Sequence, residues 1–244
     1  MPDAELLVLD PGQLDDAAPL GAVVPPDVRA TLVDPLDSDL PLPPVARAGA
    51  IAARFAGAGS VTVMAHCTNA AVGFEVAAAL SRRGATVRSV VVFAPIEVDA
   101  PVVAEHAGGL LVALGGSAAD AAADWAGDPD GALRKVTRQL RAAALNRAAG
   151  LELDPDEAED FAALLTGRYE RWLGHLAAHI GADITAPDCP VHVLDADADA
   201  GAAAARRISP RSKPHGWAVR DPLDFTDSAL RAHVVRLCAK GEEA

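Results

Sequence analysis

The sequence predicts an α/β fold, in which a mainly parallel sheet is covered by helices on both faces. Short runs rich in β-branched residues alternate with helix-like segments along the chain, and this alternation is typical of the class. The chain has 244 residues, of which 51% are hydrophobic, and this is enough for one large core. Because no repeat or second-domain boundary stands out, we expect a single domain over residues 1–244.

Hydrophobic periodicity and capping residues locate the elements. The predicted strands lie near residues 5–9, 28–33, 61–65, 86–93, 190–195 and 216–220. The predicted helices lie near residues 44–57, 69–83 and 226–239. The second of these helices carries Val72 and Val76 at helical spacing and ends at Gly84. The last helix begins at Thr226 or Asp227, either of which can cap it.

One long segment, residues 116–182, contains no strand signal and is rich in helix-forming residues. Leucines such as Leu140 and Leu176 recur there among alanines and charged residues. In an α/β protein, an insertion between two late strands lies over the carboxyl ends of the strands, where ligands bind. We therefore expect a helical lid inserted within the domain. Ordinary covering helices are the alternative interpretation.

Residues Val61 to Arg83 predict a buried strand, a tight turn and an amphipathic helix, with Cys67 at the apex of the turn. A side chain on such a turn is exposed above the sheet and faces the positive end of the helix dipole. This position lowers the pKa of a thiol and favours the reactive thiolate. Cys67 is therefore a candidate nucleophile, and a buried structural cysteine is the alternative.

Composition disfavours several classes of function. A net charge of −13 and a pI near 4.8 argue against nucleic-acid binding. The chain opens without a signal-peptide pattern and has no apolar stretch of membrane-spanning length, so we expect a cytoplasmic protein that does not contact membranes. Its three cysteines are widely spaced, which fits a reducing compartment. Because HExxH, GxGxxG after a strand and P-loop motifs are absent, we expect neither a metal nor a nucleotide cofactor.

Four segments carry a resemblance to a known family. They are LLVLDPGQ (residues 6–13), AHCTNAAVGFEVAAALSRRG (65–84), RSVVVFAP (88–95) and CPVHVLDADAD (189–199). With these segments the chain resembles the stand-alone (type II) thioesterases of polyketide and nonribosomal peptide biosynthesis, a branch of the α/β-hydrolase superfamily. The second segment resembles the family's GHSxGG elbow, with Cys67 in place of serine. The resemblance implies an α/β-hydrolase fold in which residues 116–182 form the lid.

The resemblance also implies roles for particular residues. The backbone amides of Gln13 and Thr68 would form an oxyanion hole. The acid would lie in the run of Asp195, Asp197 and Asp199, where Asp199 matches best by spacing and Asp197 second.

The resemblance leaves four possibilities for the base. Relatives carry Gly-Asp-His-Phe before the last helix, whereas this chain has Asp224 at the histidine position. Either His215 reaches Cys67, or His66 beside it serves as base, or Asp224 and a self-activated thiol run different acyl chemistry, or there is no turnover.

The function that the resemblance implies is a thioesterase-like hydrolase or acyltransferase in secondary-metabolite (antibiotic) biosynthesis. Its substrates would be small-molecule acyl groups on the phosphopantetheine of an acyl or peptidyl carrier protein. A basic stripe of Arg134, Arg138 and Arg141 is a candidate contact for such an acidic carrier, or else a solvated helix face. Two alternatives remain. The first is a catalytically degenerate protein that binds a carrier or pathway partner, and the second is a hydrolase acting on a small ester, lactone or epoxide.

Overall fold

The computed structural model describes residues 4–10, 19–24, 28–55, 59–151, 153–220 and 223–239. The chain divides into two compact units. The first consists of residues 1–97 and 183–244, and the second of residues 98–182.

The first unit is built on a six-stranded sheet with the order β2-β1-β3-β4-β5-β6. Its strands are β1 (Ala4–Leu9), β2 (Ala30–Val33), β3 (Ser60–His66), β4 (Thr86–Phe93), β5 (Val191–Asp195) and β6 (Pro214–Ala218). Every neighbouring pair is parallel. The helices of this unit are α1 (Pro44–Ala53), α2 (Ala70–Arg82), α6 (Ala198–Ile208) and α7 (Ser228–Ala239), with short 3₁₀ helices η1 (Leu20–Val23) and η2 (Cys67–Asn69). The α/β fold class predicted from the sequence is confirmed.

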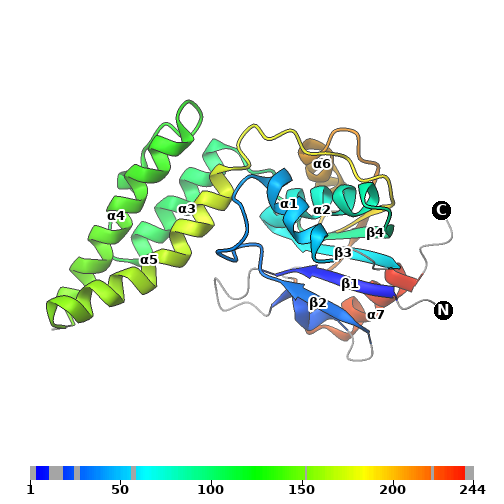
Figure 1. The fold of residues 1–244 in the computed structure, drawn as a ribbon, viewed down its shortest axis with the longest axis horizontal. Coiled ribbons are helices and arrows are strands. Elements are labelled where there is room, and N and C mark those ends of the chain that lie inside the picture. The colour runs from blue at the N-terminus through cyan, green and yellow to red at the C-terminus, as the bar shows by residue number, and fades with distance from the viewer. Residues whose placement is uncertain are drawn as a thin grey trace. The chain divides into compact units, whose positions relative to one another are not determined.

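Helices cover both faces of this sheet, with α1, α2 and α6 on one face and α7 on the other (Figure 1). This arrangement explains why the central strands are hydrophobic without alternation, since both of their faces are buried. In β3, six of the seven residues are buried. Beneath α7 the core contains Leu6, Val8, Met64, Val91, Phe93, Leu194, Phe225, Leu230 and Val234, together with Leu20 and Val23 of η1.

The second unit is helical. Its elements are α3 (Ala100–Ala113), η3 (Ala118–Ala121), α4 (Pro129–Ala149) and α5 (Pro155–Ala177). The starts of the three α-helices follow from one pattern, in which an aspartate caps the helix and a proline occupies its first turn. At α5 the Asp154 and Glu157 side chains form a reciprocal capping box. The unit includes all of residues 116–182 and also α3, for which the sequence analysis predicts no element.

Among the described residues, no helix is both long and apolar enough to cross a membrane.

Candidate functional site

Cys67 lies at the junction where β3 ends at His66 and the chain turns through η2 into α2. Its φ is +55°, a left-handed conformation that a side chain with a Cβ rarely adopts. Such a conformation costs about 1–2 kcal/mol and persists only where the surrounding structure imposes it. The strand-turn-helix predicted around Cys67 is therefore present as a strained turn with a half-buried cysteine at its apex.

The turn forms although both glycines of the GxSxG pattern are replaced. Where the first glycine would stand, Ala65 faces Gly73 of α2, and a Cβ added at Gly73 would lie 3.0 Å from the Ala65 methyl. The glycine that permits close strand-helix packing is thus on the helix in this chain. Where the second glycine would stand, Asn69 is only 2% exposed, so its side chain is accommodated inside the first unit.

The N-terminus of α2 directly follows the Cys67 turn. The first turn of α2 contains no acidic residue that would offset the positive end of its dipole. Thr68 lies in η2, at the start of this helical run, where the first amides lack partners within the helix. Thr68 and Asn69 are both buried, and their Oγ1 and Oδ1 atoms have no hydrogen-bond partner among the described residues. Unsatisfied buried polar atoms are rare in folded proteins and are more common at functional sites.

The other two cysteines are chemically different. Burial, with the nearby Asp188 carboxylate, raises the pKa of Cys189 to about 12. Burial also raises the pKa of Cys238 to about 11. Both thiols therefore stay protonated at neutral pH, which makes them poor nucleophiles.

The three candidate acids lie where β5 runs into α6, a helix that the sequence does not predict. The Asp197 carboxylate caps α6 by accepting hydrogen bonds from the amides of Asp199 and Ala200, both at 3.0 Å. Asp195 Oδ1 accepts from the Asp197 amide at 3.1 Å. Asp199 is exposed in the first turn of α6. Asp195 and Asp197 thus hold this turn together, and within the described part of the chain none of the three forms a hydrogen bond or ion pair with a histidine.

Asp224 is exposed, in a turn before α7. The Thr226 hydroxyl and amide both donate hydrogen bonds to its Oδ1, at 2.6 and 2.8 Å. These bonds hold the pKa of the Asp224 carboxyl below its usual value. At neutral pH Asp224 is therefore an ionised carboxylate with little tendency to accept a proton.

His215 is not brought to Cys67. It lies on β6 opposite His192 of β5, which is in turn level with Val91 of β4 and Met64 of β3. His215 is therefore three strands away from β3, roughly 14 Å at about 4.8 Å per strand, and level with a residue that precedes Cys67 by three. Its nearest aromatic neighbour is His192, with the ring centroids 6.2 Å apart.

His66 is the imidazole next to Cys67 along the chain, and it is half-buried. Its ring meets the Phe225 ring edge to face, with the centroids 5.2 Å apart. Phe225 also packs against Phe93 of β4 and so holds the segment before α7 near the carboxyl ends of β3 and β4. His66 and the segment that carries Asp224 are thus both held near the end of β3, where Cys67 lies, whereas His215 is not.

A buried carboxylate that no sequence motif indicates lies at the end of β1. Asp10 directly follows β1, and it is 8% exposed. Because β1 is the neighbour of β3 in the sheet, Asp10 lies at the same edge as the residues that end β3. Gln13, the second predicted oxyanion donor, lies outside the described residues. Among the described residues, no group of three or more metal-binding side chains is present.

Comparisons with known proteins identify the fold. No protein-family model and no curated protein sequence matches this chain. Among solved structures, it is similar to the Vlm2 thioesterase domain, solved with a bound dodecadepsipeptide (TM-score 0.55, 15% identity, covering 99% of this chain and 95% of that one). It is also similar to the type II thioesterase BorB from the borrelidin biosynthetic cluster (TM-score 0.53, 13% identity, covering 97% and 91%).

A third similar structure is the RedJ thioesterase from the prodiginine pathway of Streptomyces coelicolor (TM-score 0.47, 19% identity, covering 99% and 89%). The fold comparison rests on the Vlm2 and BorB structures, whose TM-scores exceed 0.5 and which this chain covers almost end to end.

The chain has an α/β-hydrolase fold like that of these two solved structures. The fold that the sequence resemblance implies is therefore confirmed. At these identities the likeness concerns the fold alone, so the chemistry has to be argued from this chain's own residues.

The second unit carries the three arginines. Arg134, Arg138 and Arg141 lie on α4 and are exposed. Arg141 pairs with Glu159 of α5 at 2.5 Å, whereas Arg134 and Arg138 form no ion pair with the other described residues.

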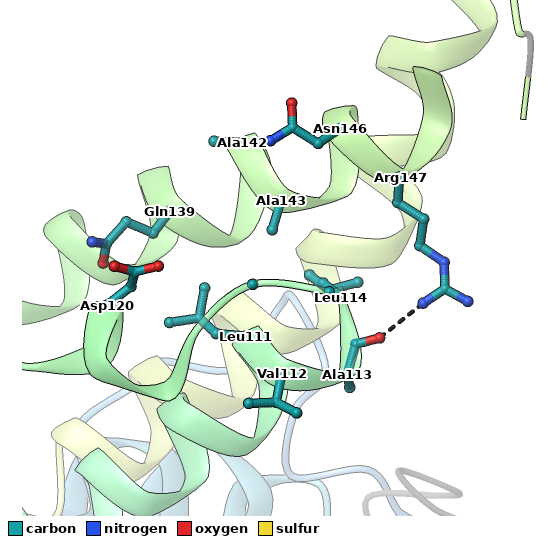
Figure 2. Close-up of a pocket in the computed structure, with 12 residues that line it drawn as sticks. Leu111, Val112, Ala113, Leu114, Asp120, Gln139, Ala142, Ala143, Asn146 and Arg147 are labelled. Atoms are coloured by element: carbon teal, nitrogen blue, oxygen red, sulfur yellow. Dashed lines mark hydrogen bonds between the residues drawn. The ribbon is translucent and has the colours of Figure 1, made fainter. Parts of the chain in front are cut away.

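The second unit also holds a solvent-open cavity of about 650 Å³ between the end of α3 and the middle of α4 (Figure 2). Leu111 and Ala143 line it, and the Gln139 amide lies beside the Asp120 carboxylate (Figure 2). None of the predicted site residues lines this cavity.

Proposed function

We propose that this chain is a thioesterase-type acyl hydrolase or acyltransferase in which the Cys67 thiolate accepts the acyl group. The observation that carries the proposal is the left-handed backbone of Cys67, at φ +55°, between β3 and the N-terminus of α2. A cysteine with a purely structural role would gain nothing from this strain. A nucleophile gains exposure and the helix dipole from it.

The chemistry proceeds in two steps. The thiolate attacks the carbonyl carbon of an acyl thioester, a new carbon–sulfur bond forms, and the bond to the donor sulfur breaks. Water or another nucleophile then attacks the acyl-cysteine and releases the product. The oxyanion that forms in each step would be held by the amide of Thr68 and by a second amide, for which Gln13 is the candidate. Each such donor is worth about 2.7–4 kcal/mol of transition-state stabilisation.

For the substrate, we propose an acyl group on a carrier protein's phosphopantetheine in secondary-metabolite biosynthesis. Two observations support this. The similar structures are a thioesterase domain bound to a dodecadepsipeptide and a type II thioesterase of a biosynthetic cluster. Arg134 and Arg138 are exposed cations on a chain whose net charge is −13, so they offer an acidic carrier a local attractive surface. We further propose that residues 116–182 form the lid.

One observation favours a second function. The position that the resemblance assigns to the catalytic histidine holds Asp224, an exposed ion hydrogen-bonded to Thr226. A protein that has lost this base could retain the fold to bind a carrier without turning over its acyl group.

The decisive experiment compares the alkylation rates of the three thiols and then the thioester hydrolysis of cysteine variants. Brief treatment with iodoacetamide followed by peptide mass mapping should label Cys67 well before Cys189 and Cys238. Hydrolysis of an acyl N-acetylcysteamine thioester should disappear in Cys67→Ala. It should persist in the matched control Cys189→Ala. If Cys67 is labelled no faster than the other two and Cys67→Ala hydrolyses as well as the native chain, the proposal is wrong. Carrier binding that survives in Cys67→Ala without any turnover in the native chain would favour the second function.

A further inference from the structure

Asp10 and His66 are neighbours across the two strands that end beside Cys67. In the parallel pairing of β1 with β3, Leu9 is opposite Ala65, so the next residue of each strand brings Asp10 opposite His66. The strand pattern continues through Asp10, whose amide donates to the Val33 carbonyl of β2 at 3.0 Å. Neighbouring strands lie about 4.8 Å apart, which is within the reach of a carboxylate and an imidazole.

The two side chains also share one face of the sheet. Side chains two residues apart on a strand point the same way. Val8 and Met64, two residues before Asp10 and His66, both belong to the core beneath α7. Independent contacts agree, because His66 packs against Phe225 of that core, and Asp10 accepts a hydrogen bond from the amide of Gly21 in η1.

Asp10 is well placed to act on a neighbour. It is 8% exposed, and its Oδ2 accepts the Gly21 amide at 3.0 Å, which fixes the carboxylate. A buried carboxylate beside an imidazole fixes the tautomer and orientation of the ring and stabilises its protonated form. The Phe225 ring limits the positions of the imidazole from another side.

The turn at Cys67 lets the side chains of His66 and Cys67 lie on the same side of the sheet. In a continuing strand, the side chains of residues 66 and 67 would point to opposite faces. The φ of +55° at Cys67 ends that alternation directly after His66. The sulfur therefore need not lie on the opposite face from the imidazole.

We propose that His66 is the proton acceptor for the Cys67 thiol and that Asp10 is the residue that positions it, so that the base stands on the strand next to the nucleophile rather than before α7. This inference rests on the proposed acyl chemistry of Cys67. The Sγ–H bond breaks and the imidazole gains the proton. The imidazolium then gives that proton to the departing donor thiolate. In hydrolysis, the neutral imidazole takes a proton from water as the water attacks the acyl-cysteine, and it returns the proton to the Cys67 sulfur.

The test measures the rate of Cys67 alkylation by iodoacetamide across pH, which needs no substrate, together with kcat and KM for an acyl N-acetylcysteamine thioester. His66→Asn should shift the midpoint of the alkylation curve to higher pH and lower kcat about 100-fold or more, with a small change in KM. Asp10→Asn should also move the alkylation midpoint to higher pH and lower kcat, but by less than His66→Asn does. The matched controls are His215→Asn and Asp39→Asn, which change an imidazole three strands away from β3 and an exposed carboxylate in the loop after β2, and both should behave as the native chain.

A second measurement covers the case in which Asp10→Asn does not fold. Added imidazole should restore part of the alkylation rate in His66→Gly, because the free base can occupy the space left by the side chain. An unchanged midpoint and kcat in His66→Asn, with Cys67 still labelled faster than Cys189, would overturn the His66–Asp10 pair and leave the proposed function intact. Absence of both selective labelling and turnover in the native chain would instead overturn the proposed function.

Discussion

Gly73 of α2 lies against Ala65 of β3 so closely that a Cβ on the glycine would be 3.0 Å from the alanine methyl. The first glycine of the GxSxG pattern is on the strand side of the nucleophile. Here that position is Ala65, and the glycine is on the helix that crosses the strand. The contact needs one residue without a side chain, and either position can supply it. This reciprocity explains how a turn lacking the strand glycine still brings the helix close to Cys67.

The reciprocity predicts a rescue. Gly73→Ala should destabilise the protein by about 1–3 kcal/mol, because an extra methyl overpacks a closed contact. Ala65→Gly alone should cost about 0.5–1 kcal/mol through backbone entropy. The double variant should recover most of the loss, since it removes the clash and gains roughly 1 kcal/mol of helix propensity. Urea unfolding of all four proteins gives the coupling, and purely additive effects would contradict it.

The strain at Cys67 predicts an inverse relation between stability and activity. Cys67→Gly should raise the free energy of unfolding by up to about 1–2 kcal/mol, because glycine adopts φ +55° without strain, while thioester hydrolysis is lost. Ala94→Gly is the matched control, since Ala94 also has a positive φ, +40°, and follows β4. It should stabilise the protein and retain the Cys67 thiol chemistry. If Cys67→Gly is destabilised while Ala94→Gly is stabilised, the packing of the Cys67 side chain contributes more to stability than its left-handed backbone costs.

The elbow could be predicted from sequence because its signals are local. The β-branched residues of β3 and the helical spacing of α2 depend only on near neighbours. Two helices were missed for equally local reasons. Gly108 and Gly109 weaken the helical pattern of α3, and alternating aspartates at the start of α6 are typical of a loop until one of them caps a helix.

The arrangement around Cys67 depends on strand order and register, which no single motif contains. The strand signal near 216–220 would leave His215 in the preceding loop. In the structure β6 begins two residues earlier, at Pro214, and His215 becomes part of the strand's first half. Asp10 and His66 are distant in sequence, and only the adjacency of β1 and β3 makes them neighbours.

A cluster of histidines on β5, β6 and α7 predicts sensitivity to acid. Burial lowers the pKa of His192, and repulsion from His215 and His233 lowers it further. The unfolded chain then binds more protons than the folded one between the lowered pKa and about 6.5. Stability is therefore full above about pH 6.5 and is lost as pH falls through the lowered pKa.

His192→Gln should lose less stability than the native chain between about pH 8 and about pH 5, measured by urea midpoints at both values. His215→Gln, which removes one source of repulsion but leaves the half-buried His192 ring, should have the same effect to a smaller degree. Equal losses in all three proteins would show that other groups govern the acid sensitivity.

Arg134 and Arg138 predict a difference between carrier-bound and free substrates. Reversing both charges to glutamate should raise KM for an acyl group on an acidic carrier protein by roughly 5- to 30-fold, since two exposed ion pairs contribute about 1–2 kcal/mol together. The kcat/KM for the acyl N-acetylcysteamine thioester should not change, because that substrate has no carrier to dock.

Arg206→Glu makes the same kind of charge change on α6 and serves as the control. Arg141 is unsuitable, because its reversal would also break the ion pair with Glu159. Raised salt should increase the native KM for the carrier-bound substrate toward the value of the double variant. If the double variant and the native chain have the same KM for this substrate at low salt, the exposed face of α4 is a solvated surface and does not bind a carrier.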